Sequence, residues 1–262
     1  MIRWRYQFDL VYELTKKELK VRYKSSVLGY LWSILNPLAL AGVFYVGLGL
    51  IVGVKGDDRH PFWLTLICGM FPWQWFFNSV NACTNVYVGN ANLIRKVAFR
   101  RELLPLATVL NDLIHFAVSI PVIVAFLLVA GGGPSAHWLY GVPLLMLAQL
   151  IMVYALGLIA GTLNVLFRDL SNLVAIFLTM LFYVTPIIYS LDHGPIAARI
   201  APYRGWILLN PAAAVVAGWK ALLLDGRFDA GYWAMAMVYA LVALGVAQVV
   251  HARLRGSLTE AA

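Results

Sequence analysis

Long apolar runs without a charged residue recur along the chain and constrain its fold more than any other feature. Residues 25–54 contain no charged side chain, and similar runs follow through most of the 262 residues. A helix needs about 20 predominantly apolar residues to cross a bilayer. Because 62% of the residues are hydrophobic and only 12% are charged, the chain lacks the polar side chains that a water-facing surface requires. The sequence therefore predicts an all-α integral membrane protein.

The positions of these runs predict six transmembrane helices in a single domain over residues 1–262. The six spans are expected at residues 31–54, 62–88, 108–130, 138–166, 172–189 and 232–250. Before the first span, Trp4, Phe8 and Leu14 recur at helical spacing among basic residues. Residues 1–24 therefore favour an amphipathic helix that lies in the cytoplasmic interface of the membrane.

Residues 190–231 do not fit the six-span pattern. The stretch 206–224 is apolar enough to span, but Asn210 and Pro211 interrupt its start and Lys220 lies near its end. Irregular backbone at membrane depth is tolerated only where protein or a watery cavity satisfies its polar groups. We expect re-entrant extracytoplasmic half-helices here, between spans five and six.

The basic residues indicate the orientation of the chain. Fourteen of the 20 lysines and arginines fall before span one, between spans two and three, between spans four and five, or after span six. Five aspartates accompany the other six basic residues on the opposite face. The positive-inside rule then predicts that both termini are cytoplasmic. The first 24 residues lack the apolar core of a cleavable signal peptide.

Several chemical functions are excluded or disfavoured by the sequence. The basic residues do not form one nucleic-acid-binding face, so no nucleic-acid partner is expected. Cys68 and Cys83 fall inside predicted spans without metal-ligand spacing, which favours a packing role, and no metal site is predicted. The dipeptide Gly-Lys is absent, so the chain has no Walker loop for nucleotide phosphates. We expect no cofactor bound by this chain and no ATP hydrolysis by it alone.

Asp112 and His115 are the strongest catalytic-looking pair, one helical turn apart in span three. Ionisable groups within a membrane are costly and often functional. Asp112 lies near the cytoplasmic end, however, and no nucleophile or third ligand completes a catalytic constellation. A structural pairing is favoured and no catalytic residue is predicted, although an intramembrane enzyme acting on a lipid-linked sugar stays open.

Span two carries four amide side chains on one helical face. Gln74, Asn78, Asn81 and Asn85 follow the spacing i, i+4, i+7 and i+11, and amides at membrane depth need hydrogen-bonding partners. The face meets either another helix, as packing glue, or a polar cavity. Amides beside aromatic rings suit sugars, and the absence of a charged relay argues against an ion-coupled carrier. The candidate residues of a translocation pathway are Tyr23, Tyr30, Ser33, Gln74, Asn78, Asn81, Asn85, Phe177 and Tyr183.

The cytoplasmic segment between spans two and three combines amides, basic residues and apolar residues. Its apolar members include Leu93, Ile94 and Val97, which a simple positive-inside anchor does not explain. The segment predicts a short helix that contacts another protein. Its candidate contact residues are Asn90, Asn92, Arg95, Lys96, Arg100 and Arg101.

Six stretches, in this order along the chain, together resemble a known family. They are residues 14–24, 28–37, 88–97, 163–170, 183–189 and 209–211. Their joint order is similar to the membrane subunit of ABC transporters that export polysaccharide, of the O-antigen, capsule or teichoic-acid type. The resemblance covers nearly the whole chain.

The resemblance implies a bacterial inner-membrane exporter. It implies a homodimer of this subunit bound to two ATPase subunits, which would hold ATP and Mg, and an undecaprenyl-linked glycan as cargo. The ATPase-coupling segment would correspond to residues 90–101, and the family's Arg-Asp pair to Arg168 and Asp169. The extracytoplasmic gate would include Tyr189, Asn210 and Pro211.

The cargo leaves an alternative open. The same family includes permeases with other substrates, so an ABC-type exporter of a small amphiphile or lipid would fit the same residues. Either kind of exporter would perform no covalent chemistry in this subunit.

Overall fold

The computed structural model describes residues 2–22, 28–57, 59–97 and 99–254, and every regular element in these ranges is helical. The bounds of the longer helices and their neighbours are α1 (Ile2–Arg22), η1 (Gly29–Leu31), α2 (Trp32–Phe44), η2 (Tyr45–Ile51), α3 (Phe62–Thr84), α4 (Val86–Gly89), α5 (Ala91–Lys96), α6 (Leu103–Val129), α7 (Trp138–Leu166) and α8 (Leu170–Val184). The remaining elements are α9 (Gly194–Ile200), η3 (Ala201–Tyr203), α10 (Arg204–Leu208), α11 (Pro211–Leu223) and α12 (Ala230–Leu254).

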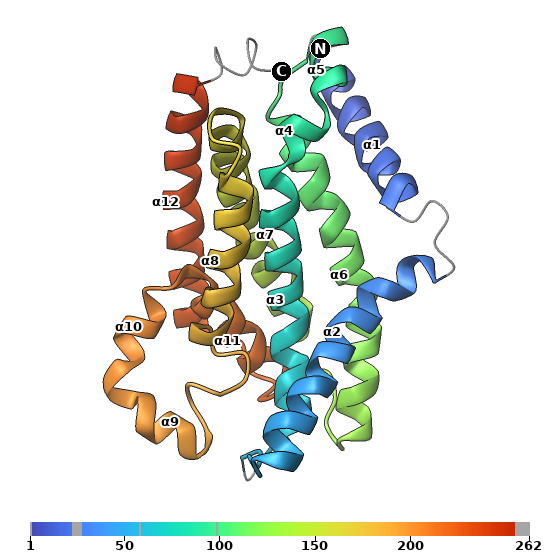
Figure 1. Cartoon of the computed structure of the whole chain (residues 1–262). Helices are drawn as coiled ribbons and strands as arrows, with labels where there is room; N and C mark the ends of the chain where they lie inside the picture. Colours follow the sequence, from blue (N-terminus) through green and yellow to red (C-terminus); the bar gives the residue numbers. More distant parts are fainter. Residues whose placement is uncertain (1, 23–27, 58, 98, 255–262) are drawn as a thin grey trace.

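The long helices form a bundle in which some neighbours, such as α3 and α6, run in opposite directions and others, such as α7 and α12, run in the same direction (Figure 1). Figure 1 shows α5, the start of α1 and the end of α12 at one end of the bundle, here called the α5 end. The elements α9, α10 and α11 lie toward the opposite end, here called the α9 end. The helices α3, α7 and α12 run toward the α5 end, whereas α6 and α8 run away from it.

Four helical stretches are long and apolar enough to cross a membrane among the described residues. They are Gly29–Ile51, Leu103–Val129, Trp138–Leu166 and Ala230–Leu254. The 23-residue α3 is not among them, and α8 has only 15 residues. The structure therefore supports an all-helical membrane protein, while the assignment of α3 and α8 as spans stays a prediction.

The observed bounds differ from the expected ones where local chemistry ends a helix. The expected span 138–166 coincides with α7, but 172–189 shortens to α8, which ends at Val184. Thr185 is extended because it precedes Pro186, and a residue before proline is driven out of the helical region. The expected span 62–88 is divided at Asn85, which separates α3 from α4.

Small residues allow close packing of α7 against α3. A Cβ added to Gly157 would lie 2.6 Å from the Cβ of Cys83, and one added to Gly161 would lie 2.6 Å from the Cys83 carbonyl oxygen. Cys83 and Cys68 are both buried and carry free thiols. The packing role expected for the two cysteines agrees with this burial.

The helix α11 belongs to the buried core. Every residue from Ala212 to Leu223 is buried, including Lys220, and the helix packs against α3, α7 and α12. The N-terminal α1 instead lies along α6 at the α5 end of the bundle (Figure 1). Its Leu14 is buried, whereas Phe8 is 71% exposed, so only part of the expected apolar face packs on protein.

Candidate functional site

A polar cavity of about 120 Å³, here called the central cavity, lies between α2, α3 and α6. Both apolar and polar side chains line it: Trp32, Ser33, Asn36, Pro37, Phe71, Gln74, Trp75, Asn78, Asp112, His115, Phe116 and Ser119. Pro37 and Ser33 come from α2 and the amides of Gln74 and Asn78 come from α3. The amide face of α3 therefore meets a cavity over part of its length.

The polar groups of the central cavity are held by short hydrogen bonds. Gln74 Nε2 donates to Asn78 Oδ1 at 2.9 Å, one turn along α3. Ser79 Oγ donates to Asp112 Oδ2 at 3.0 Å and joins α3 to α6. Asp112 and His115 are 3% and 6% exposed. The cavity wall thus offers amide, hydroxyl, carboxyl and imidazole groups beside aromatic rings, a combination that can bind hydroxyl-rich ligands.

The other predicted pathway residues do not all join this cavity. Tyr30 is 48% exposed and its ring centroid lies 5.5 Å from that of His115. Asn85 accepts a hydrogen bond from Asn164 Nδ2 at 3.2 Å, nearer the α5 end. Phe177 and Tyr183 point outward from α8, each 61% exposed. Asn81 is half-buried and does not line the central cavity. Tyr23 falls outside the described residues.

The α5 end carries the predicted coupling segment. A short helix, α5, begins after Asn90 and ends at Lys96, and its Leu93 and Ile94 pack against a core beneath it. Asn92, Arg95, Lys96 and Arg100 are exposed, and Arg101 is half-buried. The segment therefore anchors its apolar side on the bundle and presents amide and basic side chains outward, as a docking surface requires.

Contacts fix the position of α1 beside this segment. Thr108 Oγ1 donates to Glu18 Oε1 at 2.8 Å, which joins α6 to α1. Lys17 Nζ donates to Asn90 Oδ1 at 3.3 Å. Arg168 and Asp169 are exposed at the start of α8 on the same end. The α5 end thus assembles three separate sequence segments into one polar surface.

The predicted gate residues lie around the start of α11. The Asn210 side chain accepts a hydrogen bond from Ala212 N–H at 3.0 Å and so caps α11. Asn210 Nδ2 also donates to Thr185 Oγ1 at 2.8 Å. Pro211 occupies the first helical position, where its missing N–H costs nothing. Tyr189 OH donates to the Val184 carbonyl oxygen at 2.6 Å, so the exit of α8 and the entry of α11 form one unit.

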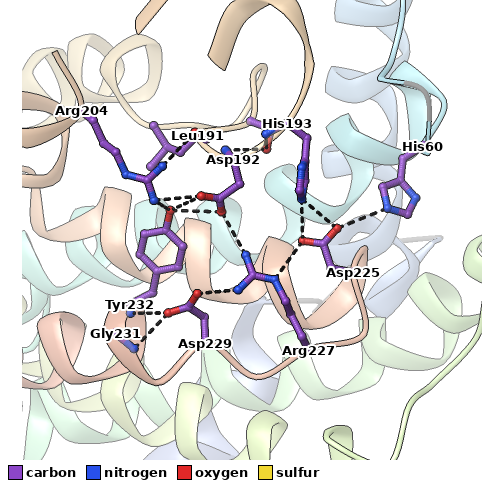
Figure 2. Close-up of polar contacts among 11 residues, drawn as sticks. His60, Leu191, Asp192, His193, Arg204, Asp225, Arg227, Asp229, Gly231 and Tyr232 are labelled. Carbon is purple, nitrogen blue, oxygen red and sulfur yellow. Dashed lines mark hydrogen bonds and ion pairs between the residues drawn. The ribbon is translucent and has the colours of Figure 1, made fainter. Parts of the chain in front are cut away.

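Sequence reasoning missed a group of charged and polar residues at the α9 end, here called the charged cluster. Its members are His60, Asp192, His193, Arg204, Asp225, Arg227, Asp229 and Tyr232 (Figure 2). They come from the loop between η2 and α3 (called the α2–α3 loop), the segment before α9, α10, the turn between α11 and α12, and the first turn of α12. The aspartates were visible in the sequence, but only as indicators of membrane orientation.

Asp192 lies at the centre of this cluster. It accepts a hydrogen bond from Arg204 at 2.8 Å and one from Tyr232 OH at 3.0 Å. Arg227 lies 3.4 Å from Asp192 and 2.7 Å from Asp229, and Figure 2 shows it between the two carboxylates. Through these contacts one aspartate ties α10 to the start of α12.

The surroundings of Asp229 favour its ionised form. Partial burial acts against the charge, but N–H groups of Tyr232 and Gly231 and the Arg227 guanidinium hold the pKa of Asp229 below its ordinary value. The carboxylates in turn raise the pKa of Arg227 above its ordinary value, against the opposing effect of partial burial. Asp229 and Arg227 therefore form an ion pair at neutral pH.

Two histidines flank another carboxylate of the cluster. His193 Nε2 lies 3.3 Å and His60 Nε2 lies 3.5 Å from Asp225 Oδ1. Among the described residues, no group of three or more potential ligands is arranged to hold a metal ion. The contacts instead join the α2–α3 loop to the turn before α12.

Comparisons with known proteins agree with a transport subunit. A family model described as ABC-2 type transporter matches residues 9–224. Two proteins of Klebsiella pneumoniae, each named O-antigen export system permease protein RfbA, are 41% and 40% identical to this chain over 228 residues, which cover 87% of this chain and 85% of each relative. A protein of Myxococcus xanthus with the same name is 31% identical over 249 residues, with 93% of this chain and 92% of the relative covered.

Proposed function

Because the chain belongs to the ABC-2 type transporter family, we propose that it is the membrane subunit of an ATP-driven exporter of lipid-linked polysaccharide, of the O-antigen type. The observation that carries this proposal is the identity of 41% over most of both chains to a protein named as an O-antigen export permease. The chain itself is a permease and not an enzyme. Asp112 accepts a hydrogen bond from Ser79 and so joins α6 to α3, which gives it a structural role.

Energy for export comes from a separate ATPase. The chain has no Walker loop, so ATP and Mg are bound by the partner. Two copies of this subunit and two ATPase subunits form the working exporter in the bacterial inner membrane. The six spans correspond to η1 through η2 (Gly29–Ile51), α3, α6, α7, α8 and α12, with both termini in the cytoplasm. The α5 end is then cytoplasmic and the α9 end extracytoplasmic.

The central cavity forms part of the translocation pathway. Gln74 and Asn78 present donors and acceptors to sugar hydroxyl groups, and the rings of Trp32 and Phe71 offer apolar faces to sugar C–H groups. Few charges line this wall, so an undecaprenyl-linked glycan can slide without being held at one site. Tyr30 in η1 and Ser33 in α2 continue the same face.

The α5 end transmits the ATPase cycle. ATP binding by the partner favours one arrangement of α1 and α5. The two copies of this subunit then move apart, which opens the pathway between them. The α9 end closes the pathway when no cargo is present. The hydrogen bond between Asn210 and Thr185, which joins the exit of α8 to the start of α11, supports this role. The direction of export comes from the different affinities of the two arrangements for the ATPase partner.

Complementation of a bacterial strain that lacks its O-antigen permease tests this function. Expression of the chain with its ATPase should restore O-antigen on the cell surface, and lipid-linked glycan should stop accumulating inside. The control replaces the Walker lysine of the ATPase subunit by alanine. Export by the permease without an active ATPase, or continued internal accumulation with both active subunits, would refute the proposal.

A further inference from the structure

A second pocket, of about 380 Å³, lies at the α9 end beside the charged cluster. It is formed between the α2–α3 loop, the start of α3 and the segment around α9. None of the sequence candidates lines it. Its ionisable members are Lys55, Asp57, His193 and Arg199.

Cationic side chains line one part of this pocket and apolar side chains line another. Lys55 and Arg199 are exposed, and neither makes a hydrogen bond or ion pair with another residue in the described ranges. Their ammonium and guanidinium groups are therefore available to an anion. Val54, Phe62, Ile188 and Ile196 supply the apolar wall.

The one carboxylate of the lining is already engaged. Asp57 Oδ1 accepts hydrogen bonds from the N–H groups of Arg59 at 2.9 Å and His60 at 2.6 Å. These bonds direct its negative charge into its own loop. The pocket keeps an excess of positive charge even with Asp57 ionised, so it favours an anionic ligand.

Glycines fix the two loops that form the pocket. A Cβ on Gly56 would lie 2.6 Å from Phe62 N, so only glycine permits this approach of the loop to the start of α3. Gly194 has a φ of +85°, and a Cβ on it would lie 3.5 Å from the Asp57 Cβ. These two glycines thus allow the loop that carries Lys55 and the segment that carries Arg199 to lie beside each other.

We propose that this pocket binds the diphosphate headgroup and the first isoprenoid unit of an amphiphilic lipid. Two cations match a headgroup with two or more negative charges better than a singly charged phospholipid, and the apolar wall matches the adjoining hydrocarbon. The identification of this lipid as cargo rests on the proposed function. The pocket would then hold the lipid end of the glycan carrier at the α9 end while the sugar chain leaves.

Binding of farnesyl diphosphate to the purified exporter in nanodiscs tests the proposal. The exporter contains both kinds of subunit, and titration calorimetry is run without ATP, so the result does not depend on transport. We expect the Lys55→Gln, Arg199→Gln double variant to bind farnesyl diphosphate at least about tenfold more weakly, because two charge-assisted contacts are lost. Arg59→Gln is the matched control, since it removes one charge from the same loop outside the pocket, and it should leave the affinity unchanged.

Three further ligands test the cationic part of the site, its apolar part and its selectivity against a phospholipid. Farnesol and inorganic pyrophosphate should each bind much more weakly than farnesyl diphosphate, because each lacks one half of the match. Phosphatidylglycerol added to the nanodisc should not displace farnesyl diphosphate. Any of three results would overturn the proposal. The native protein and the double variant could bind farnesyl diphosphate with equal affinity, or the native protein could bind farnesol or pyrophosphate as tightly as farnesyl diphosphate. The third such result is displacement of farnesyl diphosphate by phosphatidylglycerol. A failure to export with intact binding would instead count against the proposed function.

Discussion

Lys220 Nζ lies 2.9 Å from the carbonyl oxygen of Tyr189, and this contact ties the buried helix α11 to the segment that follows α8. The same nitrogen donates to the carbonyl oxygens of Pro186 and Ile187, each at 3.0 Å. Lys220 is only 5% exposed. Because the three carbonyl groups and the buried amino group of Lys220 satisfy one another, removal of either side leaves the other without a partner.

Replacement of this lysine should destabilise the α9 end of the bundle. Lys220→Met keeps most of the side-chain volume but removes all donors, so three carbonyl groups lose their partner, at a cost of about 3 kcal/mol. The apparent melting temperature in detergent should fall by several degrees. Lys16→Met, at an exposed position of α1, should leave it nearly unchanged. An equal effect of the two variants would contradict the role assigned to Lys220.

The charged cluster predicts an acid limit to stability. The folded protein holds the pKa of Asp229 below the ordinary value of 3.8, so the native state favours ionised Asp229 more than the unfolded chain does. The stabilisation is complete above about pH 5, begins to decrease near the unfolded pKa and is lost as the pH falls through the lowered folded pKa. Melting curves between pH 6 and pH 3 should show a smaller acid loss in Asp229→Asn than in the native protein. Asp9→Asn, at an exposed site of α1, serves as the control.

Close packing between α3 and α7 predicts a position-dependent effect of alanine. Gly157→Ala would set a Cβ 2.6 Å from the Cys83 Cβ, and such overpacking costs about 1 to 3 kcal/mol. A Cβ on Gly245, within α12, meets no atom within 4 Å, so Gly245→Ala should be neutral or stabilising because alanine favours a helix. The two melting temperatures measured side by side decide this prediction.

The central cavity predicts a transport defect without loss of folding. In the Gln74→Leu, Asn78→Leu double variant the bond between the two amides is removed from both sides, so little folding stability should be lost. Export of O-antigen in the complementation assay should fall about tenfold, which corresponds to about 1.4 kcal/mol of lost interaction. Thr179→Val, on the exposed side of α8, controls for a general loss of polarity. Normal export by the double variant would remove these amides from the pathway.

The exposed basic side chains of α5 predict a salt-sensitive contact with the ATPase. Arg95→Gln and Lys96→Gln together should weaken association with the ATPase subunit, and the difference from the native protein should shrink as salt increases. Co-purification at low and high salt measures this effect. Arg59→Gln carries a similar change at the opposite end of the bundle and should not alter association.

The sequence indicated which elements exist better than where some of them end. The expected span 138–166 coincides with α7 because a long apolar helix ends there without competing signals. The expected span 172–189 was too long, since the conformational effect of Pro186 on Thr185 ends α8 first. The Asn85 break between α3 and α4 was also missed, because helical periodicity alone continues through it.

Part of the candidate site could be found from spacing. The i, i+4 relation of Gln74 and Asn78 predicted one polar face, and in the structure the two side chains share a hydrogen bond and line the same cavity. The same spacing could not show that Asn85 bonds Asn164 instead, since that partner is 79 positions away along the chain. Periodicity describes one helix and carries no information on its neighbour.

Apolar run length, charge position and local motifs are properties of consecutive residues, and they were sufficient to predict a helical membrane protein without a Walker loop. Only the tertiary structure decided that Lys220 is buried among backbone carbonyls and that Asp192, Arg204 and Arg227 form one cluster. Those contacts join segments that are separated along the chain. Their stability depends on burial and on distances between helices, and the order of residues does not encode either quantity locally.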